Sequence, residues 1–514
     1  MITSYAVSIL VSYLLLWATY QVFLHPLRKF PGPVVAKLSD IYSGIHTYKK
    51  CLHLTTWKNH RRYGSVVRQG PNKLVFSSVT ALRDIYKNDR TTKPEAYMAL
   101  GPGLTAYNIF TAVDRQLHRA RRQLIGQVIT DRSMRVFEPT MIKHVDIFVR
   151  NLLCESQSSN PVDMSKQTRK LGLDLAALLG FGYELRLQTN NENQFIQTVL
   201  DTGTWTSNIF LHFPLARQLR LGPLFMFSLL GIRPKYLALM ETMITSRMAE
   251  PKDAKHDLYS FVADALATES SGLRQSDLWA EGNLFLSAAG DTVKTALSST
   301  FFYLSRNPKA YQKLAAEIRS AFTSGNEIVG TGVAGCSYLR ACIDEAIRIS
   351  PPAAGILWRD LAPDDDKNQP FIVDGHVIPR GTIVGLNTYS LHHNEDYFPD
   401  SFSYDPERWL DSSDYLPETK RIMRDAFAPF SIGPRGCAGK AMAYLETSLV
   451  LAKTMWYFDF EASPGELGEV GAGKVGAEDG RQRRSEFQLY DIFNMAHDGP
   501  CLNFRVRGDF WKDL

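Results

Sequence analysis

The sequence is poor in cysteine and carries only a small excess of positive charge. Only 6 of its 514 residues are cysteine, and they are scattered along the chain. So few and so widely spaced cysteines exclude a disulfide-stapled scaffold and indicate reduced thiols. The 58 basic and 53 acidic residues give a net charge of +5, which indicates neither a nucleic-acid partner nor acidic substrates.

The sequence shows no internal repeat, and no domain linker is visible over most of its length. A length of 514 residues allows one large domain or two to three smaller ones. Because no linker is visible before residue 464, we expect a single catalytic domain over residues 34–514. Within it, the Gly-rich, charged segment 464–484 is expected to be a surface loop.

The first 24 residues contain no Asp, Glu, Lys or Arg. As a helix, this apolar run is long enough to cross the hydrocarbon layer of a membrane, which is about 30 Å thick. Arg28 and Lys29 follow at once, and this order predicts a cytosolic body. A cleaved signal peptide is the alternative, but it needs a basic start, which residues 1–4 lack. We therefore expect a retained transmembrane anchor over residues 1–24 and a stiff, proline-rich stalk over residues 25–33.

The later part of the chain combines long helical patterns with short strand patterns. We predict four helices there, over residues 277–307, 308–322, 338–349 and 437–457. Prolines begin the second of them and end the first and the third. Short runs broken by Gly and Pro predict strands over residues 371–378 and 382–386. Much helix with a smaller, segregated strand region predicts a mainly α fold of the α+β class.

The strongest chemical signal is the motif F-x-x-G-x-R-x-C-x-G, which begins at Phe430. Cys437 is expected to open a helix, where free N–H groups and the helix dipole favour a thiolate. Gly433 and Gly439 would let the backbone approach a flat cofactor, Phe430 would shield the sulfur, and Arg435 would pair with a ligand carboxylate. A buried free cysteine is the alternative, but it explains neither the glycines nor the arginine.

With this motif the chain resembles the cytochromes P-450, which are haem-thiolate monooxygenases, over roughly residues 25–510. The resemblance implies a cytochrome P-450 fold behind the transmembrane helix. It also implies haem b as the cofactor, with Cys437 as the axial ligand of the iron. A thiolate ligand donates electron density to haem iron and favours cleavage of the O–O bond.

Two further motifs follow the family's order. Glu345 and Arg348 match the family's E-x-x-R and lie on one helical face. Residues 405–409 resemble its P-E-R-W element. The resemblance implies that Arg408 completes a Glu–Arg–Arg cluster beneath the cysteine loop, with a structural role.

The predicted helix over residues 277–307 resembles the oxygen-activating helix of the family. Its residues 288–292 match A-G-x-D-T, with Ala289 where the family often has glycine. The resemblance implies that small residues leave room for dioxygen and that Asp291 and Thr292 deliver protons. The alternative is a threonine bonded to the carbonyl four residues earlier and a solvated aspartate.

The haem carboxylates need cations and the substrate needs an apolar wall. The resemblance assigns the carboxylates to His118, Arg122, Arg359 and Arg435. His118 stands where the family commonly has Trp, and Arg119 and Arg121 are expected to be surface charges. The expected pocket residues are Ala288, Ala354, Ile356, Leu357 and Phe493.

Nucleotide and zinc sites are not expected. Gly471, Gly473 and Gly476 fit a dinucleotide fingerprint, but no strand precedes them. His392 and His393 would point apart in an extended segment, so no zinc site is predicted. Electrons must then come from a separate protein. For an anchored member, the resemblance implies an NADPH-dependent flavin reductase on the same membrane, docking on the cysteine side of the haem.

Together these features predict a membrane-anchored haem monooxygenase that uses O2 to oxidise an apolar small molecule. The sequence of the stalk, residues 25–33, is similar to that of fungal family members that tailor terpenes, polyketides or alkaloids. The expected location is the endoplasmic reticulum membrane, with a cytosolic catalytic domain. Two alternatives remain: a haem-thiolate isomerase or dehydratase, whose relatives tend to lose the acid–threonine pair, and a non-enzymatic haem or lipid carrier.

Overall fold

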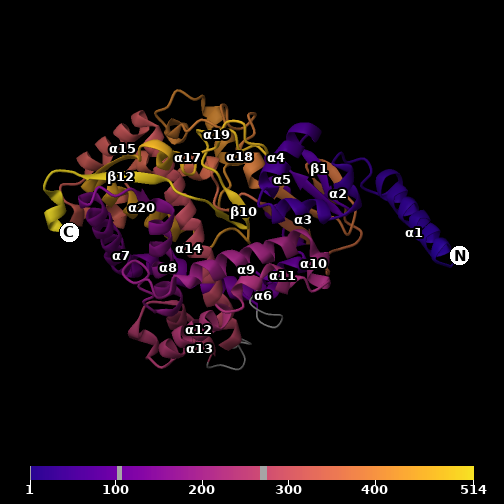
Figure 1. The fold of residues 1–514 in the computed structure, drawn as a ribbon, viewed down its shortest axis with the longest axis horizontal. Coiled ribbons are helices and arrows are strands. Elements are labelled where there is room, and N and C mark those ends of the chain that lie inside the picture. Colours follow the sequence, from indigo (N-terminus) through magenta and orange to yellow (C-terminus); the bar gives the residue numbers. More distant parts are fainter. Residues whose placement is uncertain (1, 101–106, 267–274) are drawn as a thin grey trace.

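A computed structural model describes residues 2–100, 107–266 and 275–514. A helical body carries several small sheets, with β1 at the end near α1 and β12 at the opposite end (Figure 1), which confirms the predicted α+β class. The four predicted helices are α14 (Gln275–Arg306), α15 (Pro308–Ala321), α17 (Ser337–Ile349) and α20 (Lys440–Tyr457). Because α20 begins at Lys440, Cys437 lies in the loop before the helix rather than at its start.

The other elements complete the body. Its helices are α2 (Val34–Leu38), α3 (Ile41–Tyr48), α4 (Leu52–Tyr63), α5 (Val79–Tyr86), α6 (Arg115–Gly126), α7 (Asp131–Gln157), α8 (Met164–Phe181), α9 (Phe195–His212), α10 (Pro214–Gln218), α11 (Gly222–Phe225), α12 (Arg233–Met248), α13 (Leu258–Leu266), α16 (Gly330–Val333), α18 (Thr388–His392) and α19 (Pro417–Ala426). Segment 464–484 is mostly exposed and includes the short 3-10 helix Gly465–Glu469, while Gly468, Ala472, Gly473 and Gly480 within it are buried.

The main sheet has five strands in the order β1 (Val66–Gly70), β2 (Lys73–Phe76), β8 (Ile383–Asn387), β5 (Ile356–Leu361) and β3 (Thr91–Thr92). Strands β2 and β8 are parallel and the other pairs are antiparallel. The two predicted strand regions form β8 and the hairpin β6 (Phe371–Val373)–β7 (His376–Ile378). A further sheet joins β4 (Val162–Asp163), β12 (Cys501–Val506) and β9 (Phe458–Ala462). The hairpin β10 (Tyr490–Ile492)–β11 (Asn494–Ala496) reaches α14.

Helix α14 passes through the core and packs closely on α8 (Figure 1). Glycines make this approach possible, because a Cβ at Gly290 would come within 2.6 Å of Leu173, and one at Gly172 within 2.9 Å of the Gly290 carbonyl oxygen. Gly290 in the A-G-x-D-T match is therefore required by helix packing. The space expected for dioxygen is bordered instead by Ala288 and Ala289, which line the central cavity.

The N-terminal helix α1 (Ile2–Thr19) continues as a π-helical turn, Tyr20–Leu24, and projects from the end of the molecule that carries β1 and α2 (Figure 1). The span Thr3–Leu24 has a mean hydropathy of 1.7, and none of it is buried. The predicted stalk, residues 25–33, contains turns and no helix, and its Leu27 and Phe30 are buried in a hydrophobic cluster with β2 and α5. The Arg68 N–H donates to the Pro31 carbonyl at 2.7 Å, so this segment packs against the body.

Candidate active site

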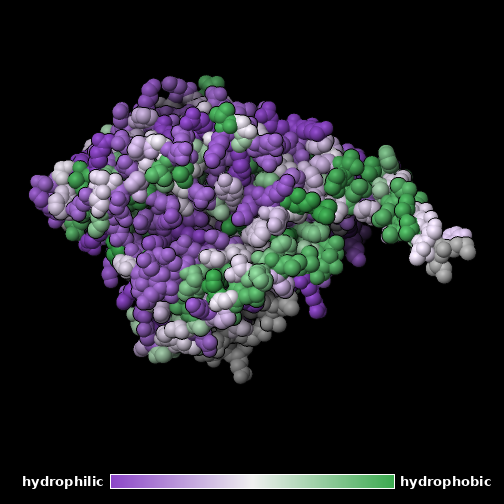
Figure 2. All heavy atoms as spheres, in the orientation of Figure 1, coloured by the Kyte–Doolittle hydropathy of each residue, from purple (hydrophilic) through white to green (hydrophobic). Residues whose placement is uncertain are grey.

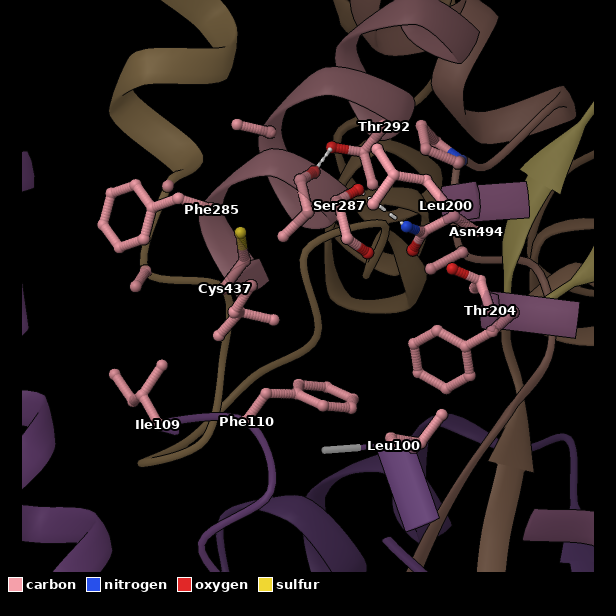
Figure 3. Close-up of a pocket in the computed structure, with 18 of the residues that line it drawn as sticks. Leu100, Ile109, Phe110, Leu200, Thr204, Phe285, Ser287, Thr292, Cys437 and Asn494 are labelled. Atoms are coloured by element: carbon pink, nitrogen blue, oxygen red, sulfur yellow. Dashed lines mark hydrogen bonds between the residues drawn. The ribbon is translucent and has the colours of Figure 1, made fainter. Parts of the chain in front are cut away.

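A cavity of about 600 Å³ lies between α9, α14, β5 and the cysteine loop (residues 430–439). The structure brings these predicted residues to its wall: Ala288, Thr292, His118, Arg122, Leu357, Phe430, Arg435, Cys437 and Phe493. Figure 3 shows Cys437 and Thr292 at this cavity. Ala354 and Ile356 are not on the wall; both are buried in neighbouring hydrophobic clusters. Because side chains alternate along a strand, Ile356 faces away where Leu357 faces the cavity.

The cysteine loop is held by its own backbone and by α5. The Cys437 N–H donates to the Phe430 carbonyl at 2.8 Å. Gly433 has φ +76°, and a Cβ there would lie 1.9 Å from the Tyr86 carbonyl oxygen, so this glycine is required by α5 rather than by a cofactor. Gly439 lines the cavity, and a Cβ there would meet no protein atom within 4 Å. The space beside Gly439 is thus open.

The environment of Cys437 differs from that of a thiol at a helix start. Protein surrounds the residue, but its side chain is accessible from the cavity. Burial raises the pKa of the Cys437 thiol, against the opposing effects of the Gly439 N–H, Arg122 and Lys440. Position near α20 therefore does not by itself produce a thiolate here. A coordinated metal ion deprotonates a thiol outright. The site therefore fits a Cys437 that becomes a thiolate by binding a metal ion.

Buried positive charge gathers at one edge of the cavity. His118, Arg122 and Arg435 line both this cavity and an adjoining one of about 270 Å³, and Arg359 lines the adjoining one. Burial and then the repulsion of Arg359 lower the pKa of Arg435 to about 10. Burial, Arg435 and further cations lower the pKa of His118 to about 3. His118 is therefore a neutral hydrogen-bonding group in this state, and the arginines carry the charge.

Lys93 belongs to the same cluster, and the sequence did not single it out. Its ammonium group lies 3.4 Å from the Phe110 ring centroid. Burial, Arg359 and Arg435 hold its pKa well below the usual range. Among the described residues, no carboxylate forms an ion pair with Lys93, Arg122, Arg359 or Arg435. Such uncompensated buried charge is costly, and the two carboxylates of haem would neutralise it. The residues present therefore fit haem b.

The two proton-delivery candidates lie differently. Thr292 borders the cavity, and its hydroxyl donates to the Ala288 carbonyl at 2.6 Å. Asp291 is 2% exposed and faces α8, where the Arg169 Nε lies 2.9 Å from its carboxylate. Arg169 also binds Asp201 through two hydrogen bonds of 2.8 and 2.6 Å. Asp291 is therefore neither solvated nor on the cavity wall. An arginine that the sequence did not indicate joins it to Asp201.

The predicted Glu–Arg–Arg residues are in contact with one another. Glu345 accepts two hydrogen bonds of 2.8 Å from Arg348 and one of 3.2 Å from Arg408. Trp409 Nε1 donates to the same carboxylate at 3.0 Å. Glu345, Arg348 and Arg408 are at most 2% exposed. A charge group this deeply buried is tolerated only because every member is paired.

His392 connects this cluster to Ala428, two residues before the cysteine loop, a link absent from the sequence interpretation. Its Nε2 accepts from the Ala428 N–H at 3.0 Å. Its Nδ1 therefore carries the proton and donates to the Arg348 carbonyl at 3.0 Å. Burial lowers the pKa of His392 to about 3, so the ring is neutral. His392 ends α18 rather than lying in an extended segment as predicted, because Asn387 caps that helix.

The prediction of surface charge is right for Arg119 and wrong for Arg121. Arg119 is exposed. Arg121 is 5% exposed, and its guanidinium lies 3.0 Å from Asp277 and 3.8 Å from Glu281 on α14. Its helix α6 follows a loop bound to α14, since the Ile109 N–H donates to Glu281 at 2.8 Å.

The chain is similar to known proteins over nearly its whole length. A family model described as Cytochrome P450 matches residues 29–469. The cytochrome P450 monooxygenase AKT7 of Alternaria alternata is 31% identical over 97% of this chain and 96% of its own length. The cytochrome P450 monooxygenase apf7 of Gibberella fujikuroi is 33% identical over 98% and 97% of the two chains. The cytochrome P450 monooxygenase poxM of Penicillium oxalicum is 31% identical over 97% of this chain and 94% of its own length.

Proposed function

The chain belongs to the cytochrome P450 family and is a haem-thiolate monooxygenase, and we propose that it is a membrane-anchored enzyme that oxidises an apolar small molecule. The observation that carries the proposal is the cavity that Cys437 and Thr292 share beside a cluster of cations with which no carboxylate of the described residues forms an ion pair. When bound, haem would supply oxygen activation, and the protein supplies binding, orientation and electrostatics.

The residues of the site divide this work among them. Cys437 would ligate the iron, and Arg122, Arg359, Arg435 and Lys93 would bind the haem carboxylates. Thr292 is fixed at the cavity wall by its bond to the Ala288 carbonyl, so its oxygen is positioned to hold a proton-donating group. General acid catalysis by positioned groups contributes about 10²–10⁴-fold to a rate.

Asp291 would renew that proton through its carboxyl group. It is buried on Arg169, while Asp201 on the other side of Arg169 has a side chain 41% exposed. Arg169 thus joins buried Asp291 to Asp201 at the surface. We propose that when Arg169 shifts its bonds toward Asp201, the Asp291 carboxylate is released to take a proton from water and pass it toward the cavity, with Arg169 charged throughout.

A Thr292→Ala variant tests the proposal. With a reductase and NADPH supplied, we expect product formed per NADPH oxidised to fall about 10-fold or more, because the positioned hydroxyl is lost. The measurement compares product by mass spectrometry with NADPH and O2 consumption. Thr300→Ala is the matched control, since that hydroxyl makes the same bond, 2.7 Å to the Ala296 carbonyl, at a fully buried position on α14. Unchanged coupling in Thr292→Ala contradicts the proton role. Product formed without NADPH or O2 consumption supports an isomerase or dehydratase instead.

The substrate that we propose is an apolar secondary metabolite, such as a terpene, polyketide or alkaloid. Support comes from near full-length similarity to monooxygenases of Alternaria, Gibberella and Penicillium. The wall of the cavity is also largely apolar, with Leu200, Leu229, Phe285 and Phe493 among its residues. Mass spectrometry of products from a host metabolite extract identifies the substrate directly.

We also propose a location on the endoplasmic reticulum membrane, where an NADPH-dependent flavin reductase supplies the electrons. Figure 2 shows an apolar surface that runs from α1 onto the adjacent body. Its exposed members on and next to α2, α3, α10 and α11 are Val34, Val35, Ile41, Ile45, Leu215, Leu219, Leu224, Phe227 and Leu230. Apolar patches of this kind mark membrane or protein contact sites. Their continuity with α1 supports one bilayer as the common partner.

Deletion of residues 2–24 is expected to leave part of the protein on salt-washed microsomes. Adding Leu224→Glu and Phe227→Glu to that deletion is expected to release the protein, because charged side chains are costly in the apolar layer. Fractionation followed by immunoblotting measures the shift. Val475→Glu with Val506→Glu is the control pair, at exposed apolar residues of the C-terminal region. Complete release by the deletion alone contradicts a second membrane contact.

A further inference from the structure

One side of the cavity is polar although most of its wall is apolar. Thr204 on α9, Ser287 on α14 and Asn494 on β11 all line the cavity. Figure 3 shows these three side chains gathered on one side, with Cys437 on the other. They come from three elements far apart in the sequence, so only the fold brings them together.

The hydrogen-bonding capacity of this group is unused. The Asn494 amide nitrogen donates to the Ser287 carbonyl at 2.9 Å, which fixes the amide and leaves its Oδ1 as a free acceptor. Nowhere in the described parts of the chain does a partner reach this Oδ1 or the hydroxyls of Thr204 and Ser287. Helical Ser and Thr often bond to the carbonyl four residues earlier. Thr206, two residues along α9, does so at 2.8 Å to Thr202.

We infer that Thr204, Ser287 and Asn494 form a polar anchor for a hydroxyl group of an otherwise apolar substrate. The inference rests on the proposed function and names the substrate class more closely. A hydroxyl both donates and accepts. The substrate hydroxyl can therefore donate to Asn494 Oδ1 and accept a hydrogen bond from the hydroxyl of Ser287 or Thr204. The surrounding apolar wall would hold the hydrocarbon body, as is usual in ligand pockets with few polar groups.

The anchor has a consequence for the order of reactions. A substrate that enters with a hydroxyl has already passed a step that introduced or exposed oxygen, such as a hydroxylation, a carbonyl reduction or a cyclisation ended by water. This enzyme would therefore oxidise a second position. The anchored hydroxyl would decide which carbon is presented to the oxidising centre.

Binding of matched probes to the full-length holoenzyme tests the anchor. The pairs are limonene with perillyl alcohol and farnesene with farnesol, and equilibrium dialysis gives the dissociation constants. A site built to hydrogen-bond a hydroxyl rejects the analogue that lacks it. We expect wild-type protein to bind each alcohol at least about 10-fold more tightly than its hydrocarbon. In Ser287→Ala/Thr204→Val only Asn494 Oδ1 remains to bind the hydroxyl, so we expect this preference to fall at least about 3-fold, with hydrocarbon binding little changed.

Thr206→Val is the matched control on the same helix, because its hydroxyl is already bonded to Thr202. It should keep the alcohol preference. Absence of any preference in wild-type protein, including failure to bind either member of a pair, overturns the inference. So does a preference that is undiminished in the double variant or falls equally in Thr206→Val. The reduced, CO-bound spectrum of each preparation separates the two proposals: a normal thiolate band without alcohol preference overturns the anchor alone, whereas a missing band overturns both.

Discussion

Cys437→Ser is expected to abolish the red-shifted band of the reduced, CO-bound protein and to reduce product formation to the level without enzyme. A serine oxygen is a far poorer donor of electron density to haem iron than a thiolate, and O–O cleavage depends on that donation. The change is small in volume, so the loop should keep its bond from residue 437 to the Phe430 carbonyl. Difference spectroscopy and mass spectrometry of products measure the two effects.

Cys154→Ser is the matched control, because this cysteine is exposed on α7 and lies away from the cavity. It should retain both the spectrum and the turnover of wild-type protein. A Cys437→Ser protein that keeps turnover, or a Cys154→Ser protein that loses it, contradicts the assignment of Cys437 as the ligand.

The cysteine loop could be predicted from the sequence because its signal is local. Phe430, Arg435 and Cys437 lie within eight consecutive residues, so the motif is visible in the sequence. The loop closes on itself through the hydrogen bond from the Cys437 N–H to the Phe430 carbonyl. Helix α17 could also be predicted from the sequence, because its helical pattern ends just before a pair of prolines. In both cases the residues that determine the structure lie within one segment of the chain.

The remainder depends on neighbours that lie far away in sequence. Gly433 is explained by a carbonyl of α5, and Gly290 by a leucine of α8. Lys93 gains its importance from Arg359 and Arg435, which come from β5 and the cysteine loop. Its sequence surroundings do not distinguish it from a surface lysine. The sequence likewise indicates a surface charge at Arg121, because its ion-pair partner Asp277 lies far away in sequence, on α14.

Glu345→Gln is expected to have the second large effect, a loss of stability of about 3–5 kcal/mol, because removal of one member of a buried charge group leaves the others uncompensated. The amide would still fill the space and could still accept from Trp409, which now donates at 3.0 Å. The positive charges of Arg348 and Arg408 would then be buried without an anion. His392, bonded to the Arg348 carbonyl, would carry the disturbance to Ala428. From there it would reach the cysteine loop, because the Ser431 N–H donates to the Ala428 carbonyl at 3.0 Å.

Haem content per chain and the urea midpoint of the holoprotein measure this loss. Glu418→Gln is the matched control, since the Glu418–Arg421 pair on α19 is exposed and such pairs contribute little. Adding Arg408→Met to Glu345→Gln removes one of the two uncompensated charges, so the double variant should recover part of the haem content and of the midpoint. If Glu345→Gln behaves like Glu418→Gln, the cluster does not hold the cysteine loop. If the double variant is less stable than Glu345→Gln alone, burial of unpaired charge is not the cause of the loss.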